Sequence, residues 1–178
     1  MRIAIFSSWL PIISSSNREF IKKISQYCCE KNITIVTGGC NGIPSIAVEN
    51  TFNCGGTTIG YFPFENIDKY HTSKHKENTD ESLSFYSKSY FIKGFNSRSL
   101  AMIHNVDAAI VINGRIGTLS EATMAIEEEL PLLVFEDTKG IASELKNIIK
   151  KTGKKITNKI MFNKKVNYKK AINNLLSH

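Results

Sequence analysis

Short runs of β-branched and other apolar residues alternate along the chain with longer stretches in which apolar positions recur every three or four residues. The short runs predict buried strands, and the longer stretches predict amphipathic helices. Because this alternation is typical of βαβ units, it predicts an α/β fold around a mainly parallel sheet. We expect strands at 2–7, 33–36, 57–61, 88–92, 107–112, 131–135 and, more weakly, 159–162. We expect helices at 17–31, 43–54, 95–105, 117–129, 141–150 and 168–176.

Residues 63–88 do not follow this pattern. Pro63, Asn66, Asp68 and a run of polar residues predict a loop with a short strand only at its end. A connection of this length suggests either a lid or a segment whose elements the pattern conceals. No repeat, low-complexity tract or linker interrupts the chain, so we expect residues 1–178 to form one domain.

The composition is that of an ordinary globular protein, with 178 residues, 42% of them hydrophobic and 22% charged. No apolar run approaches the roughly 18 residues that would span a bilayer, so we expect no membrane association. Residues 1–6 lack a long apolar signal core and a cleavage site and instead predict a strand. These features favour a cytoplasmic protein.

The cysteines carry no recognisable motif. The chain has four of them: Cys28, Cys29, Cys40 and Cys54. Two are adjacent and none forms a C-x-x-C pair, so their spacing predicts neither a disulfide framework nor a zinc knuckle. Cys40, in a glycine-rich turn, either carries a reactive thiol or fills a small space. His71 and His75 lie in polar sequence, which favours exposed loop histidines over metal ligands, and we expect no metal.

The net charge of +7 is concentrated at one end of the chain. Residues 139–178 hold eleven lysines and one acidic residue, Glu144, so they carry +10 and the rest carries −3. The lysines either contact nucleic acid or an acidic partner, or reflect a composition rich in Lys, Asn and Ile. No interleaving of arginine with aromatic residues and no helix-turn-helix pattern is present, so a nucleic-acid partner is not expected.

Two predicted turns between a strand and a helix are rich in glycine. Residues 37–44 include Gly38, Gly39 and Gly42, and residues 113–118 include Gly114 and Gly117. In an open parallel sheet ligands bind beyond the carboxyl ends of the strands, where glycine lets the backbone approach and free amides favour an anion. The two turns therefore predict a site for one phosphorylated ligand. The alternative is that the glycines only satisfy tight turn geometry.

The second turn also carries Thr118 and, three residues later, Glu121. This spacing fits a capping box, which would give the pair a purely structural role. The same spacing also lets Glu121 face the space above the sheet. Both interpretations remain open from the sequence.

The glycine motifs resemble those of a known family. Residues 36–39, 41–42 and 55–63 are similar to the GGxxG…GGxxxGxxP pattern of the LOG-like proteins, also called the lysine decarboxylase-like or SLOG family. Arg98, Met102 and residues 107–111, 114 and 117–121 are similar to its R…M…DAxI…PGGxGTxxE signature. The family includes cytokinin riboside 5′-monophosphate phosphoribohydrolases and a molybdenum-cofactor carrier-like branch, which residues 117–122 resemble most.

This resemblance implies a Rossmann-like, three-layer α/β/α fold, a homodimer, and cleavage of a nucleoside 5′-monophosphate into free base and ribose 5-phosphate. It implies that Arg98 and Glu121 are catalytic and that neither a metal nor a cofactor is needed. A carboxylate suits an oxocarbenium-like transition state, and a guanidinium suits a phosphate or a departing base. The alternative is a non-catalytic protein of the same fold that binds or carries a nucleotide or the molybdenum cofactor.

The sequence departs from the family on the predicted ligand-facing loops. The family's Pro-Gly-Gly is Asn113-Gly114-Arg115 here, and Arg115 either binds the phosphate or obstructs the pocket. The small-residue turn after the first strand is Ser7-Ser8-Trp9. We expect the phosphate against residues 114–118, including Arg115, Gly117 and Thr118, with Gly38, Gly39 and Gly42 on the opposite wall. Such departures are expected where the ligand has changed or activity is lost.

Overall fold

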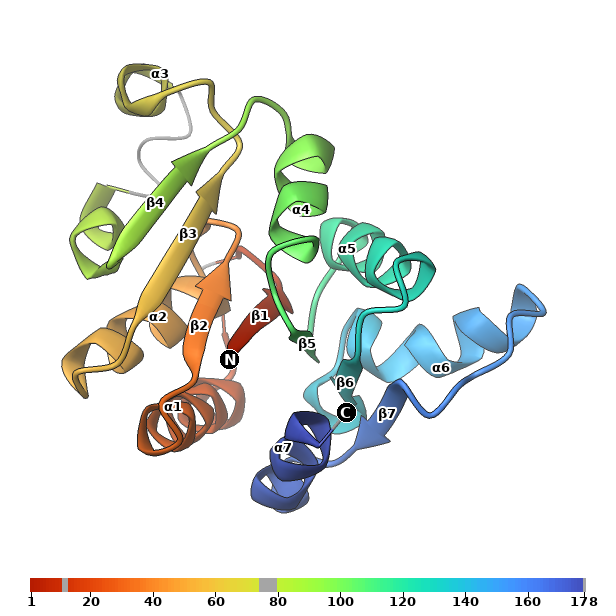
Figure 1. Cartoon of the computed structure of the whole chain (residues 1–178). Helices are drawn as coiled ribbons and strands as arrows, with labels where there is room; N and C mark the ends of the chain where they lie inside the picture. Colours follow the sequence, from red (N-terminus) through yellow and green to blue (C-terminus); the bar gives the residue numbers. More distant parts are fainter. Residues whose placement is uncertain (11–12, 74–79, 178) are drawn as a thin grey trace.

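The strands form one parallel sheet whose order reverses beside the first strand. The computed structural model describes residues 1–10, 13–73 and 80–177. Within them the sheet order is β4-β3-β2-β1-β5-β6-β7, and every neighbouring pair is parallel. The strands are β1 (Arg2–Ser7), β2 (Thr34–Thr37), β3 (Thr58–Phe62), β4 (Lys88–Phe91), β5 (Ala108–Ile112), β6 (Leu132–Phe135) and β7 (Ile160–Asn163). The first half of the chain builds outward from β1 on one side and the second half on the other, so the point of reversal lies between β1 and β5 (Figure 1).

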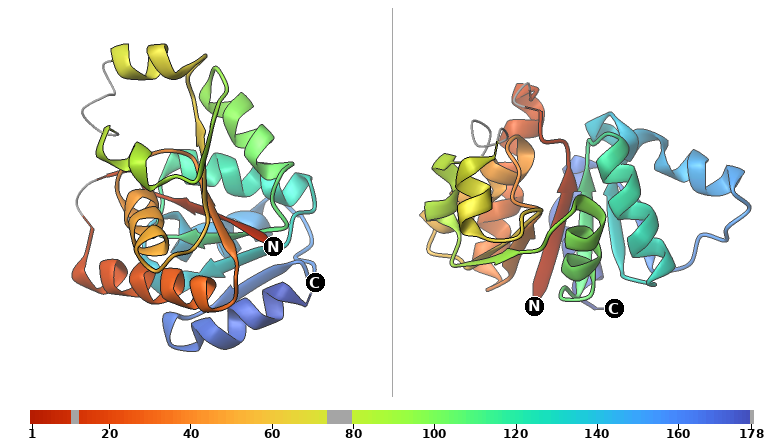
Figure 2. Two further views of the ribbon diagram at one scale, coloured as in Figure 1. Left: turned by 60° about the vertical axis from the view of Figure 1, so that its left-hand side comes forward. Right: turned by 90° about the horizontal axis from the view of Figure 1, so that it is seen from above.

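Helices cover both faces of this sheet. One face packs against α1 (Ser15–Glu30), α2 (Ile43–Asn53) and α7 (Tyr168–Leu176). The other packs against α4 (Phe95–Ile103), α5 (Ile116–Glu127) and α6 (Ile141–Lys151), and Figure 2 shows the two layers on either side of β1. The predicted three-layer, Rossmann-like α/β fold is confirmed, and the predicted strands and these six helices lie within a few residues of their expected bounds.

The alternation of side chains along β1 explains the two cores. Ile3 and Ile5 point into the core under α1, α2 and α7, whereas Ala4 and Phe6 point into the core under α4, α5 and α6. Because both faces are covered, every residue of β5 is buried, as a central parallel strand requires.

The prediction of a loop over residues 63–88 is wrong for most of its described part. This segment contains α3 (Ile67–Thr72), a 3₁₀ turn over Asp80–Phe85 and the start of β4. The Asn66 side chain caps α3 by accepting a hydrogen bond from the Lys69 amide at 2.9 Å. Tyr70 packs edge-on against Phe62, with ring centroids 5.4 Å apart. Elements this short are held by aromatic packing and a cap, so they leave no helical period in the sequence.

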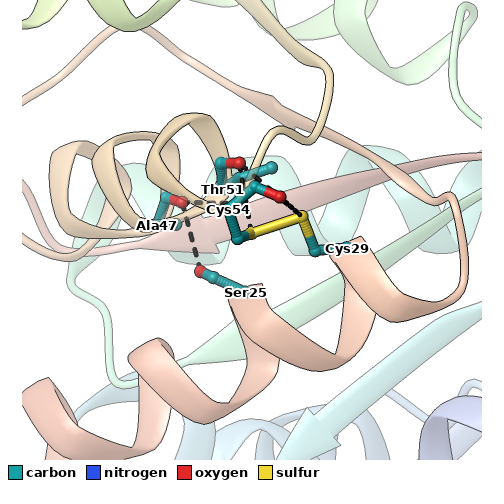
Figure 3. Close-up of a disulfide and its surroundings, with 5 residues drawn as sticks. All are labelled: Ser25, Cys29, Ala47, Thr51 and Cys54. Carbon is teal, nitrogen blue, oxygen red and sulfur yellow. Dashed lines mark hydrogen bonds between the residues drawn. A yellow bond between two sulfur atoms is a disulfide. The ribbon is translucent and has the colours of Figure 1, made fainter.

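The cysteine spacing predicts no disulfide framework, but the structure contains one disulfide. Cys29 at the end of α1 and Cys54 at the end of α2 are joined by a disulfide (Figure 3). The two helices pack side by side, and the Ser25 hydroxyl of α1 donates a 3.1 Å hydrogen bond to the Ala47 carbonyl of α2. Spacing in sequence could not show this pairing, because it depends on how α1 and α2 meet. Cys28 is free and buried, which raises the pKa of its thiol to about 12.

The lysines of the C-terminal quarter are distributed over several elements rather than gathered on one. Lys154 and Lys159 pair with Glu127 and Glu129 at 2.7 and 2.9 Å, so part of the positive charge offsets the acidic end of α5. No helix among the described residues has the length and apolar character needed to cross a bilayer. The described residues also contain no cluster of three or more His, Cys, Asp or Glu that could hold a metal ion, and His75 lies outside them.

Candidate functional site

A cavity of about 330 Å³ opens where the strand order reverses, beyond the carboxyl ends of β1 and β5. This is the position at which open parallel sheets bind ligands. It is lined by Ile5, Ser7, Ser8, Trp9, Gly38, Cys40, Pro44, Phe95, Asn96, Arg98, Ser99, Arg115, Ile116, Gly117, Thr118, Ser120 and Glu121.

Three helices begin at this cavity. Its lining includes Pro44 in the first turn of α2, Phe95 and Asn96 at the start of α4, and Ile116 and Gly117 at the start of α5. In α5 the first intrahelical bond runs from the Leu119 amide to the Arg115 carbonyl at 2.9 Å, so the preceding amides are left for other partners. The positive ends of three helix dipoles therefore point toward one hollow, which favours an anion there.

Arg98 of α4 and Glu121 of α5 meet at the floor of the cavity. Arg98 Nη1 donates to Glu121 Oε1 at 2.8 Å, and the Ser99 hydroxyl donates to the same oxygen at 3.2 Å. The side chains of Arg98 and Glu121 are 5% and 13% exposed, so the pair is almost fully withdrawn from water. No hydrogen bond from a described residue reaches Glu121 Oε2, and Arg98 Nε is buried without a partner among those residues. Glu121 Oε2 is thus left for a ligand, whereas Arg98 Nε is enclosed by the protein.

Gly38 makes room for this pair. A Cβ atom added at Gly38 would overlap the Nη1 and Cζ atoms of Arg98. The backbone of Gly38 is not left-handed, so the close approach of the guanidinium is the reason for glycine at this position.

Burial raises the pKa values of two groups that line the cavity, Glu121 and Cys40. Removal from water raises the pKa of Glu121, although Arg98 and Ser99 act in the opposite direction. Burial likewise raises the pKa of the Cys40 thiol, with Arg98 lowering it and Glu121 raising it further. Cys40 therefore stays protonated, which favours the space-filling interpretation over a reactive thiolate.

Tyr86, which lies between the 3₁₀ turn and β4, supports the first glycine turn. The Tyr86 hydroxyl and Thr37 Oγ1 lie 2.7 Å apart in a hydrogen bond, and the Gly39 amide donates to Thr37 Oγ1 at 3.4 Å. Tyr86 is buried, and burial raises the pKa of its phenol. Sequence analysis missed Tyr86, because nothing in the pattern connects it with a turn almost fifty residues earlier.

The predicted binding residues divide into two groups. Gly38, Arg115, Gly117 and Thr118 line the cavity with the Arg98–Glu121 pair. The other three glycines, Gly39, Gly42 and Gly114, do not appear in its lining. All three have positive φ, and a Cβ atom there would overlap Phe62, the Ser8 carbonyl and Thr118, respectively. They shape the turns around the cavity.

The capping-box interpretation of Thr118 and Glu121 is wrong. Helix α5 begins at Ile116 with Arg115 as its N-cap and has no side-chain cap, so Thr118 is already its third residue. Glu121 instead reaches across to α4. One further cavity residue, Phe95, precedes Arg98 by a single helical turn, and this spacing is the signal that could have identified it.

Comparison with known proteins identifies the family of the chain. A model of the SLOG cluster4 family matches residues 10–170. The chain belongs to this family. This match confirms the resemblance to the LOG-like, or SLOG, family that the sequence motifs predicted. No functionally curated protein matches the sequence significantly.

Solved structures share the fold of this SLOG protein at low identity. The X-ray structure of TM1055, a structural genomics target, is 19% identical over 97% of this chain and 98% of its own, with a TM-score of 0.77. The molybdenum cofactor binding protein of the phototrophic bacterium Rippkaea orientalis is 17% identical over 98% of this chain and 96% of its own, with a TM-score of 0.75. DNA processing protein A of Helicobacter pylori is 21% identical over 99% of this chain and 80% of its own, with a TM-score of 0.69. Its structure is described for a single-stranded DNA binding mode. These likenesses establish the fold alone.

Proposed function

We propose that this SLOG protein hydrolyses the N-glycosidic bond of a nucleoside 5′-monophosphate, releasing free base and ribose 5-phosphate. The observation that carries the proposal is the buried Arg98–Glu121 pair in the cavity where three helices begin. An anion site and a buried carboxylate side by side are what a phosphorylated sugar with a breakable C1′–N bond requires.

The proposed arrangement assigns each end of the substrate to one part of the cavity. The 5′-phosphate accepts hydrogen bonds from the amides of Ile116, Gly117 and Thr118, and Arg115 at the rim supplies a second positive charge. The ribose then lies near Glu121. The anion and the carboxylate are kept apart because the amides belong to the start of α5 and Glu121 to its second turn.

The proposed reaction breaks the C1′–N bond while a water oxygen bonds to C1′. The ribose carries positive charge in the transition state, and the ionised Glu121 carboxylate stabilises that charge and orients the water. A proton of the water passes to the departing base. The Arg98 guanidinium fixes Oε1 by its hydrogen bond, which leaves Oε2 to face the reacting sugar.

The test is incubation of the protein with AMP, GMP, CMP and UMP, with free base measured by chromatography. At least one nucleotide should release base, and Glu121→Gln should lower the rate by about a hundredfold or more, as loss of a group that stabilises the transition state does. Thr123→Ala, on the exposed side of the same helix, is the matched control. Nucleotide binding without base release from any of the four would contradict the proposal.

A second candidate is a non-catalytic protein that binds a phosphorylated heteroaromatic molecule such as the molybdenum cofactor. It is favoured by Arg115, which stands where the family's signature has glycine, and by the fold shared with a molybdenum cofactor binding protein. Under this candidate, ligand binds tightly and is recovered unchanged. The same chromatography therefore separates the two candidates.

We also propose that the protein is a cytoplasmic homodimer, as the resemblance to LOG-like proteins implies. Size-exclusion chromatography with light scattering at several concentrations tests the dimer. A particle near 20 kDa at every concentration would contradict it.

A further inference from the structure

Large apolar side chains gather around the mouth of the cavity. Trp9, Phe95 and Ile116 all line it, and they are 49%, 59% and 79% exposed. Single exposed apolar residues are ordinary on protein surfaces, but a group around one hollow indicates a binding surface.

The two aromatic rings come from different elements. Trp9 follows the end of β1, and Phe95 opens α4 one turn before Arg98. Among the described residues, no ring-to-ring contact involves either of them. Both side chains are also about half exposed, so a ligand ring can reach them, and aromatic rings stack well on nucleobases.

We infer that Trp9 and Phe95 bind the planar heteroaromatic ring of a nucleotide whose phosphate lies at the start of α5. This inference rests on the proposed function, to which it adds the residues that recognise the base. Trp9 stands where the first turn of the family pattern has a small residue, so we do not expect this recognition throughout the family.

The polar half of the cavity favours a nucleotide over an apolar protein segment. A protein segment seated on Trp9 and Phe95 would cover Arg115 and the amides of α5 without pairing them, which costs free energy. A nucleotide satisfies both halves, because its phosphate pairs with the amides and its base covers the rings. The volume of about 330 Å³ is in the range of small-molecule sites.

The chain supplies its own reporter for this inference, since Trp9 is its one tryptophan. Titration with AMP should quench the tryptophan emission to a plateau. Titration with ribose 5-phosphate, which lacks a base, should leave the emission unchanged, and added ribose 5-phosphate should reverse the quenching by AMP. AMP binding without quenching would overturn the inference.

Variants separate the ring contacts from the phosphate contacts. By calorimetry, Trp9→Leu and Phe95→Leu should each weaken AMP binding roughly tenfold while changing ribose 5-phosphate binding less than twofold. Phe52→Leu, an exposed phenylalanine outside the cavity, is the matched control and should bind both as the natural protein does. Equal loss of affinity for both ligands would overturn the inference.

The remaining outcomes distinguish this inference from the proposed function. Quenching by AMP with no base release from AMP, GMP, CMP or UMP supports ring binding and contradicts the hydrolase. Base release with no effect of either leucine variant on AMP binding supports the hydrolase and overturns ring binding. Conversion of a dimer to a monomer by Trp9→Leu or Phe95→Leu, with AMP binding intact, would assign the rings to a second copy of the chain and overturn the inference. Failure of both ligands to bind would overturn both proposals.

Discussion

The Arg98 guanidinium occupies the space that a side chain at position 38 would need, and position 38 is glycine. A Cβ atom on Gly38 would overlap Arg98 Nη1, and Nη1 is the atom that donates to Glu121 Oε1 at 2.8 Å. A residue without a side chain therefore governs the geometry of the charged pair opposite it. The first glycine turn contributes to the site through this packing as well as through any contact with a ligand.

Gly38→Ala should displace the guanidinium and break the pair. We expect base release to fall at least tenfold and the free energy of unfolding to fall by about 1–3 kcal/mol, as overpacking usually costs. Arg98→Met gives the control background, because Gly38→Ala should have much less effect on activity once the guanidinium is gone. Steady-state rates of the four proteins of this double-mutant cycle measure the coupling, and strictly additive effects would contradict the shared-space interpretation.

The pH dependence of base release should report Glu121. Burial raises the pKa of Glu121 above its ordinary value of 4.5. Between pH 4.5 and the raised pKa, the Glu121 carboxyl is therefore protonated in the folded protein and largely ionised in the unfolded chain. This group's contribution to stability therefore decreases as pH rises from 4.5 through the raised pKa, while activity rises over the same window. Ser99→Ala removes a hydrogen bond to the carboxylate and should move the acidic limb of the kcat/KM profile to higher pH. Thr123→Ala should leave the limb unmoved, and a downward shift in Ser99→Ala would contradict the assignment.

Arg115 should strengthen phosphate binding rather than block it. It is exposed at the rim beside the first amides of α5, where a guanidinium can approach an anion without being desolvated. Arg115→Gln should weaken binding of ribose 5-phosphate about tenfold and reduce the dependence of that binding on salt, both measured by calorimetry. Arg18→Gln, an exposed position on α1, is the control. Tighter binding in Arg115→Gln would identify Arg115 as an obstruction.

Tyr86→Phe should loosen the first glycine turn. It deletes the hydroxyl that bonds Thr37 at 2.7 Å within a buried setting, so the free energy of unfolding should fall by about 1 kcal/mol. Urea denaturation measures the change. Tyr90→Phe is the matched control, because the half-buried Tyr90 has no hydrogen bond from its hydroxyl to a described residue. An equal effect of the two variants would contradict the supporting role of Tyr86.

The disulfide between Cys29 and Cys54 should form in the purified protein without reductant. Two of the four cysteines should then react with a thiol reagent in denaturant, and all four after reduction. Replacing both Cys29 and Cys54 with serine should lower the free energy of unfolding by about 2–4 kcal/mol relative to the oxidised protein. Four reactive thiols before reduction would contradict the pairing.

The sheet and its large helices could be predicted because each carries a clear period. The apolar run at 107–112 and the helical spacing at 17–31 both identify elements within two residues of their true bounds. The short helix α3 could not be predicted in this way. Its stability comes from the Asn66 cap and from the packing of Tyr70 on Phe62, which are contacts that a local pattern does not reveal.

The residues of the candidate site that belong to a family motif could be predicted from the sequence. Arg98 and Glu121 were expected together from the family resemblance, and their 2.8 Å contact agrees with that expectation. Their catalytic role stays a prediction. The parts that depend on tertiary contact were not predictable, because the support of Thr37 by Tyr86 and the fit of Gly38 to Arg98 join residues that are distant in sequence.

The three helix starts around the cavity have a practical consequence for anyone handling the protein. Their positive field comes from the peptide backbone, so it persists in every side-chain variant discussed above. We therefore expect inorganic phosphate or sulfate in a buffer to compete with the proposed nucleotide for that position. Measurements in a chloride medium with an organic amine buffer should consequently give stronger apparent affinities than the same measurements in phosphate-buffered saline.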